Sequence, residues 1–218
     1  MIPYLNGFQD PKRVIEDIKA TIALYCQDNI AQYFDKLMTN PDPNCTIKRL
    51  RRGTIITVAD FNASIAKFLN QWKSHYRKTS TPVLLPALLE AVTIANGPDL
   101  PEALDKVNQE HLQIIKHLFN RLNQVPRIGP TTISKLLALL RPSLFMLWDA
   151  KIQRDYGLAG NAMGYARFMG VMADFARLLK ENMLDVEAYI RDPNRQYITP
   201  LAKSLDEWNI IKSKKLEE

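Results

Sequence analysis

The chain has little cysteine: Cys26 and Cys45 are the only two among its 218 residues. Two cysteines can build neither the disulfide framework of a small secreted domain nor a four-cysteine metal site. Histidine is also scarce, and His111 and His117 lie six positions apart, which places them on different faces of a helix. This spacing argues against a helical zinc pair. We therefore expect no metal and no other cofactor.

Long hydrophobic runs are absent. No apolar stretch reaches the roughly 18–20 residues that a membrane span requires. The first four residues, Met-Ile-Pro-Tyr, lack the basic and then apolar layout of a signal peptide. The sequence therefore predicts a cytoplasmic protein without a membrane partner.

Glycine-rich loops and strand patterns are missing as well. The chain contains no phosphate-binding glycine loop, no dinucleotide fingerprint and no nucleophile elbow. Only residues 54–58, a β-branched run, have the composition of a strand. Neither internal repeats nor low-complexity tracts occur. These absences indicate that the fold consists mainly of helices.

What the chain does contain is the composition of an ordinary globular protein, with 46% hydrophobic and 24% charged residues. Its length suits one domain or two closely packed lobes. The formal net charge is +6 and the pI is about 9.3. An excess of positive charge favours a polyanionic partner such as nucleic acid.

Apolar residues recur at helical spacing along nearly the whole chain, which predicts about nine or ten helices in an all-α bundle. Pro101 is expected to open a long helix that includes His111 on its apolar side. Residues 61–72 are expected to form one helix capped by Thr57 or Asp60. A last helix follows Pro200, with Leu201, Leu205, Trp208 and Ile211 facing inward and a charged tail.

The densest basic cluster, residues 48–52, contains Arg49 and Arg51. Such a cluster contacts nucleic-acid phosphates in many DNA-binding proteins. A solvated loop is the alternative, because runs of charge usually face water.

Residues 125–156 are the most informative stretch. Pro126 ends the preceding helix, Gly129 permits a tight turn, and Pro130 suits the first turn of a new helix. The short apolar run 144–148 then leads to Asp149, a favourable N-cap for a further helix. The pattern predicts two packed helices joined by a tight hairpin, followed by a carboxylate at a helix start.

This arrangement resembles the helix-hairpin-helix DNA glycosylases, the superfamily that includes endonuclease III and the alkyladenine glycosylases. Residues 125–129, Val-Pro-Arg-Ile-Gly, match the hairpin, and Asp149 matches the catalytic carboxylate. Thr131 stands where the lyase branch has its nucleophilic lysine, 18 residues before Asp149. Arg127 replaces the first hairpin glycine, and Lys151 replaces a frequent histidine. The iron–sulfur cysteines of endonuclease III are also absent.

The resemblance implies an all-α, glycosylase-like fold in which two helical lobes surround the helix-hairpin-helix motif. We expect one compact unit over residues 1–218. Residues 82–183 would form the core that carries the motif, and residues 1–80 and 184–218 would form the second lobe.

The resemblance also implies a binding site for duplex DNA and a reaction. Asp149 would hydrolyse an N-glycosidic bond with water, as a monofunctional glycosylase, or would only cap its helix. Trp148 would stack on an extruded base or lie in the core. The residues expected to contact DNA are Arg127, Ile128, Gly129, Thr131, Lys135, Lys151, Arg49 and Arg51. The alternative function is a non-catalytic helix-hairpin-helix module that binds DNA or a protein, and the sequence names no protein partner.

Overall fold

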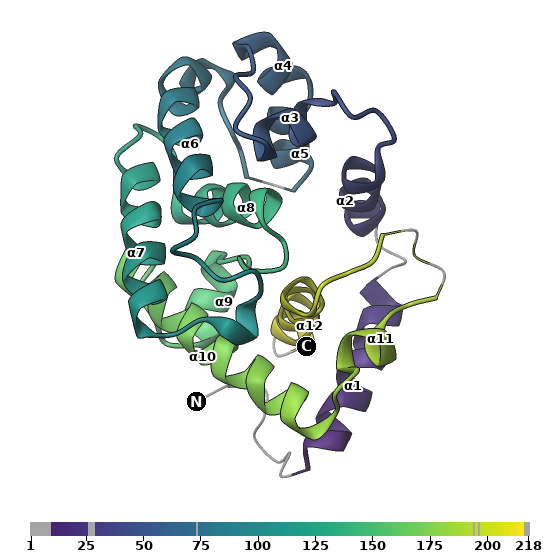
Figure 1. The fold of residues 1–218 in the computed structure, drawn as a ribbon. Coiled ribbons are helices and arrows are strands. Elements are labelled where there is room, and N and C mark those ends of the chain that lie inside the picture. The colour runs from purple at the N-terminus through teal and green to yellow at the C-terminus, as the bar shows by residue number, and fades with distance from the viewer. Residues whose placement is uncertain (1–9, 26–28, 73, 194, 196, 216–218) are drawn as a thin grey trace.

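The computed structural model describes residues 10–25, 29–72, 74–193, 195 and 197–215, which form helices and loops without a strand (Figure 1). The α-helices are α1 (Pro11–Tyr25), α2 (Asn29–Thr39), α3 (Thr46–Arg51), α4 (Val58–Ala63), α5 (Ile65–Gln71), α6 (Thr81–Ala95), α7 (Gln109–Asn123), α8 (Pro130–Leu140), α9 (Ala150–Asp155), α10 (Ala162–Asn182), α11 (Val186–Ile190) and α12 (Leu201–Lys215). Short 3-10 turns lie at Lys78–Ser80 and Leu104–Lys106. The all-α prediction is confirmed for these residues. In the strand-like run, residues 54–57 have no regular secondary structure, and Val58 begins α4.

The helices pack in two overlapping sets. Helix α1 lies against α10, α11 and α12, whereas α7 lies against α6, α8 and α10. Helices α3 and α4 pack on α6, and α3 also packs on α8. Part of the 1–80 segment therefore contacts the helices that carry the hairpin, while α1 contacts the C-terminal helices. The division into two lobes stays a prediction.

The hairpin between α7 and α8 spans residues 124–129. Arg127 has a φ of +65°, whereas Gly129 is the N-cap of α8 in an extended conformation with a φ of −92°. Gly129 thus lies at the tight turn between two packed helices, as expected, but it does not adopt the left-handed conformation. The left-handed residue is Arg127, at the position where the resemblance leads one to expect the first hairpin glycine. An L-residue in this conformation costs about 1–2 kcal/mol relative to glycine.

Two helix boundaries differ from those predicted. Helix α7 begins at Gln109 rather than near Pro101, because Asn108 caps it: the Asn108 side chain accepts from the His111 N–H, and the His111 ring accepts from the Asn108 N–H. His111 is therefore a half-buried capping residue and not a core histidine. The helix expected over 61–72 is divided at Ser64 into α4 and α5, and Thr57 caps α4 as predicted.

Helices α8 and α12 are the central helices of the fold. Residues 132–140 of α8 and 201–209 of α12 are all buried, on every face. The expectation that α12 buries one apolar side is wrong, since Lys203, Asp206 and Glu207 are buried too. Polar side chains on these two helices must therefore find partners inside the protein.

Candidate functional site

Asp149 caps α9, as the sequence predicts. Its Oδ1 accepts hydrogen bonds from the amides of Lys151, at 3.0 Å, and Ile152, at 2.9 Å. The residue is half-buried, and Oδ2 makes no hydrogen bond with any other residue that the structure describes. One oxygen therefore holds the helix, whereas the other has no protein hydrogen bond among the described residues.

The segment that leads to Asp149 is held in place by hydrogen bonds to α8 and α12. The Leu147 N–H donates to Asp206 Oδ1 at 2.8 Å, and the Trp148 N–H donates to Ser134 Oγ at 2.9 Å. These bonds link residues that are 59 and 14 positions apart in the chain. Asp149 is thus placed by two buried helices rather than by a loose loop.

Trp148 belongs to the core. Its exposed fraction is 0%, and its ring packs against Phe168 with a centroid distance of 4.7 Å. The buried indole Nε1 has no hydrogen-bond partner among the described residues. The interpretation of Trp148 as a base-stacking residue does not fit this placement, because no face of the ring is open to a nucleotide.

Lys135 extends from α8 into the interior near Asp149. It is 7% exposed, and its Nζ donates to the Trp72 carbonyl and to Ser74 Oγ, the latter at 3.1 Å. Burial lowers the pKa of Lys135 to about 8, while the carboxylates of Asp149 and Asp206 act in the opposite direction. The expectation that Lys135 contacts DNA does not fit this placement, because its ammonium is enclosed by protein.

The lowered pKa of Lys135 predicts a stability that rises with alkalinity. Between about pH 8 and pH 10.5 the unfolded chain carries a proton that the folded chain has lost, so raising the pH favours folding. One pKa unit corresponds to ~1.4 kcal/mol, and the gain relative to Lys135→Met is expected to be at most roughly 3 kcal/mol. Urea unfolding of both proteins from pH 7.5 to 10 measures it, and parallel pH curves would contradict the prediction.

Arg49 and Arg51 make contacts within the protein. Arg49 donates to Asp60 at 3.3 Å and to the Ile55 carbonyl at 2.9 Å. Arg51 places Nε and Nη2 at 2.8 and 2.6 Å from the Leu139 carbonyl at the end of α8, and burial lowers its pKa. Arg51 therefore ties α3 to the end of α8, and the role expected for it in DNA contact does not fit a guanidinium that is half-buried and bonded within the protein.

The hairpin itself offers exposed donors. The Arg127 side chain is exposed, whereas Ile128 is 5% exposed and contributes packing. The amides of Gly129 and Thr131 make no hydrogen bond with other described residues, as is usual for the first turn of a helix. Lys151 is half-buried in the first turn of α9, beside the Asp149 cap.

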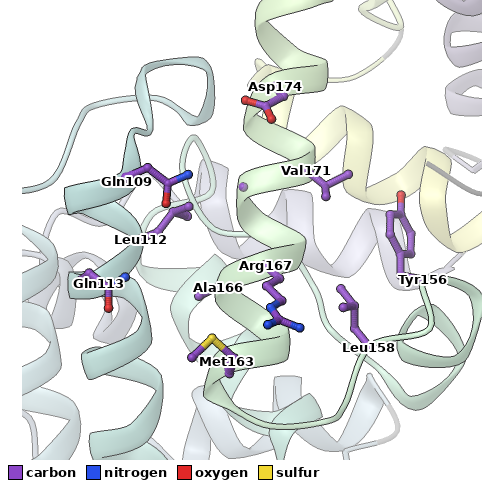
Figure 2. Close-up of a pocket in the computed structure, with 11 residues that line it drawn as sticks. Gln109, Leu112, Gln113, Tyr156, Leu158, Met163, Ala166, Arg167, Val171 and Asp174 are labelled. Atoms are coloured by element: carbon purple, nitrogen blue, oxygen red, sulfur yellow. The ribbon is translucent and has the colours of Figure 1, made fainter. Parts of the chain in front are cut away.

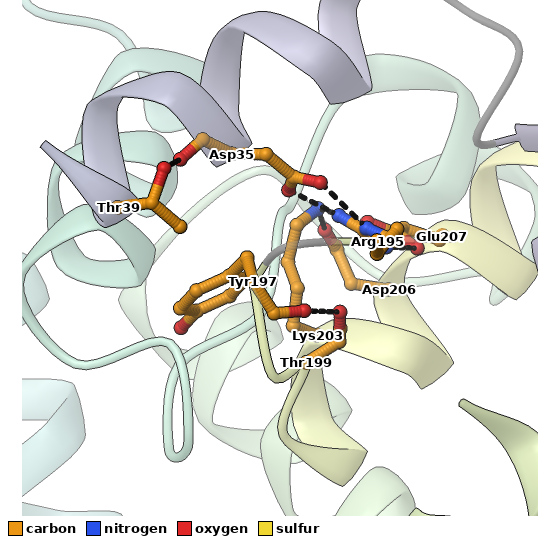
Figure 3. A network of polar contacts seen from close by, with 8 residues as sticks. All are labelled: Asp35, Thr39, Arg195, Tyr197, Thr199, Lys203, Asp206 and Glu207. Carbon is orange, nitrogen blue, oxygen red and sulfur yellow. Dashed lines mark hydrogen bonds and ion pairs between the residues drawn. The ribbon is translucent and has the colours of Figure 1, made fainter. Parts of the chain in front are cut away.

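A buried ionic cluster of Asp35, Arg195, Lys203, Asp206 and Glu207 lies behind this site (Figure 3). Arg195 donates to both oxygens of Asp35, at 2.8 and 2.5 Å, and to Glu207 Oε2 at 2.7 Å. Lys203 lies 2.8 Å from Asp206 and 3.5 Å from Glu207. Burial alone would lower the pKa of Lys203, but the two carboxylates outweigh it and keep the ammonium charged.

The cluster reaches the candidate site through Asp206, which pairs with Lys203 and also accepts the Leu147 N–H. This cluster was not predicted from the sequence. Its only sequence signal is a lysine followed by acidic residues three and four positions later on the last helix. That pattern is equally typical of an exposed helix face. Only the burial of these side chains in the structure shows that they form an internal ionic cluster.

A separate groove lies between α7 and α10 (Figure 2). Two adjoining hollows of about 500 and 460 Å³ share Gln109, Leu112, Gly170 and Asp174. Gly170 permits α10 to approach α7 closely, since a Cβ at this position would lie 3.0 Å from the Leu112 side chain. No residue predicted from the sequence for the site lines either hollow.

Within the described ranges, no cluster of three or more histidine, cysteine or acidic side chains has the geometry to hold a metal ion. The search for membrane spans over the same residues finds no helix of sufficient length and apolarity.

The chain belongs to a family described as a family of unknown function (DUF6308), which matches residues 31–202. No curated protein and no solved structure matches the chain. The matched segment includes the hairpin, Lys135 and Asp149, and it ends just before Lys203. The family description names no reaction.

Proposed function

We propose that this protein binds duplex DNA and hydrolyses the N-glycosidic bond of an altered base, with Asp149 as its catalytic carboxylate. The observation that carries the proposal is the position of Asp149. It follows the α7–α8 hairpin, 18 residues after Thr131, and keeps one carboxylate oxygen without a protein hydrogen bond among the described residues.

The reaction requires the carboxylate to be negatively charged and to lie close to the sugar. As the bond from C1′ of the sugar to the base lengthens, positive charge develops on the sugar, and the Asp149 oxygen stabilises it. Water then adds to C1′, and the departing base takes up a proton. The target nucleotide must leave the duplex to reach the carboxylate. Thr131 has no amine with which to form an imine, so the product is an intact strand with an abasic site.

The hairpin would supply the contacts to the DNA phosphates. The free amides of Gly129 and Thr131 lie at the N-terminus of α8, an eleven-residue helix whose dipole favours a phosphate. The exposed Arg127 adds a positive charge at the same turn. Such contacts fix the protein on the backbone without reading the base sequence.

A non-catalytic binding module is the second candidate function. Asp149 accepts from two amides of α9, and this capping role accounts for a carboxylate at this position without any chemistry. In that case the hairpin would bind DNA or a protein, and no base would be released.

A panel of duplexes that carry alkylated, deaminated or oxidised bases separates these functions. We expect free base from at least one substrate, with strand breakage only after alkaline treatment. Borohydride is expected to trap no covalent protein–DNA adduct. Binding without base release from any lesion would leave the binding module as the function.

DNA binding itself is expected to depend strongly on salt and on Arg127. Affinity for duplex DNA should be micromolar or tighter in low salt and should fall steeply as salt rises, because bound cationic side chains displace counterions. Arg127→Ala should weaken binding equally for all DNA sequences. It should not lower the stability of the fold, because the Arg127 side chain is exposed and its left-handed backbone is already strained. Fluorescence anisotropy against a salt series measures both effects.

The matched control is Arg13→Ala, because Arg13 is an exposed arginine on α1, a helix that packs on α10, α11 and α12. It carries the same change of charge, so equal weakening by both variants would show that only net charge matters and would remove the hairpin from the proposal.

A further inference from the structure

The segment that follows α5 brings a hydroxyl to a buried amine. Ser74 is half-buried, and its Oγ lies 3.1 Å from Lys135 Nζ. The same Nζ donates to the Trp72 carbonyl. A neutral amine has two N–H groups and one lone pair. It can therefore donate to the carbonyl and accept the Ser74 hydroxyl proton at the same time.

His75, the residue after Ser74, has a strained backbone. Its φ is +50°, a left-handed value that costs about 1–2 kcal/mol for a residue other than glycine. Strain of this kind persists where the surrounding structure enforces it, and it concentrates at functional sites. The His75 amide makes no hydrogen bond with another described residue, and its side chain is exposed.

We propose that Ser74 and Lys135 form a nucleophile–base pair that hydrolyses carboxylic esters, with the His75 amide as a donor to the oxyanion. The amide after a nucleophile is a recurrent oxyanion donor, because it lies beside the carbonyl under attack. This activity does not use Asp149 as its catalytic group and does not rest on base excision.

The atoms balance without a further reactant except water. Ser74 Oγ bonds to the ester carbonyl carbon as its proton moves to Lys135 Nζ, and the oxyanion forms beside the His75 amide. The ester C–O bond then breaks, and the departing alcohol takes the proton from Nζ. Water, deprotonated by the same amine, releases the acid and restores Ser74.

The amine is suited to this role at mildly alkaline pH. Burial lowers the pKa of Lys135 to about 8, although Asp149 at the start of α9 and Asp206 on α12 favour the charged form. The Trp72 ring, 5.9 Å from Nζ, also favours the charged form. Ester attack should therefore accelerate as the pH rises through about 8 and should level off above it.

A fluorophosphonate probe, with peptide mapping by mass spectrometry, tests the pair. We expect a covalent adduct on Ser74, whose rate of formation rises with pH through about 8. Ser74→Ala should abolish it, and Lys135→Met should slow it roughly 100-fold or more, as loss of a general base does. Ser64→Ala, a change at another half-buried serine, should leave labelling unchanged.

Absence of an adduct on Ser74 at pH 9 would overturn the proposal, as would equal labelling rates in the wild type and in a folded Lys135→Met protein. If Lys135→Met does not fold, hydrolysis of p-nitrophenyl acetate by the wild type and by Ser74→Ala decides instead. Loss of turnover in Ser74→Ala supports the pair, and equal turnover excludes it. Base release from DNA is measured separately, so failure of either proposal leaves the other standing.

Discussion

Asp149→Asn is expected to abolish base release while the protein stays folded and still binds DNA. The amide has almost the same shape as the carboxylate but no negative charge to stabilise the developing cation. We expect a loss of roughly 10³-fold or more in the single-turnover rate, equivalent to about 4 kcal/mol of transition-state stabilisation. DNA affinity should be nearly unchanged, because the substitution acts mainly on the transition state.

Two further variants separate catalysis from capping. Asparagine is as good an N-cap as aspartate, so Asp149→Asn should melt like the wild type, whereas Asp149→Ala should lose about 1 kcal/mol of stability. Asp155→Asn changes a carboxylate at the other end of α9 and should retain activity. Full activity in a folded Asp149→Asn protein would end the enzymatic proposal, and unfolding of that variant would assign Asp149 a mainly structural role.

Arg195→Met should produce the largest loss of stability. Arg195 is 7% exposed and holds two carboxylates, and Glu207 has an exposed fraction of 0%. Removing the guanidinium leaves a buried charge without that partner, which typically costs 3–5 kcal/mol. Because domains are stable by only about 5–15 kcal/mol, the change is expected to lower the urea midpoint strongly or to prevent folding.

A control and a rescue make this result specific. Arg191→Met alters an exposed arginine of the same segment and should shift the free energy of unfolding by less than about 0.5 kcal/mol. Adding Glu207→Leu to Arg195→Met should recover part of the loss, because it removes the buried carboxylate that has lost Arg195 as a partner. A double variant that is less stable than the single one would show that Glu207 depends mainly on Lys203.

The sequence by itself determined which segments are helical and where several of them begin. Asp149 caps α9 and Thr57 caps α4 because these effects act within one turn of chain, where the residue types suffice. The hairpin was also located correctly between α7 and α8, since proline and glycine act locally. The sequence does not indicate which residue of the hairpin is left-handed. In the structure that residue is Arg127 and not a glycine.

Only the tertiary structure decided which charged side chains are buried. Lys135 and Lys203 look like ordinary surface cations in the sequence, yet both are buried against distant parts of the chain. Lys135 donates to the Trp72 carbonyl, and Lys203 lies near the rings of Tyr25, Phe34 and Trp72. The cause is the central position of α8 and α12, which covers every face of these helices. Helical periodicity can indicate one apolar face, but it cannot show that a second set of helices will cover the polar one. The lowered pKa of Lys135, its contact with Ser74 and the ionic cluster behind Asp149 all follow from that covering.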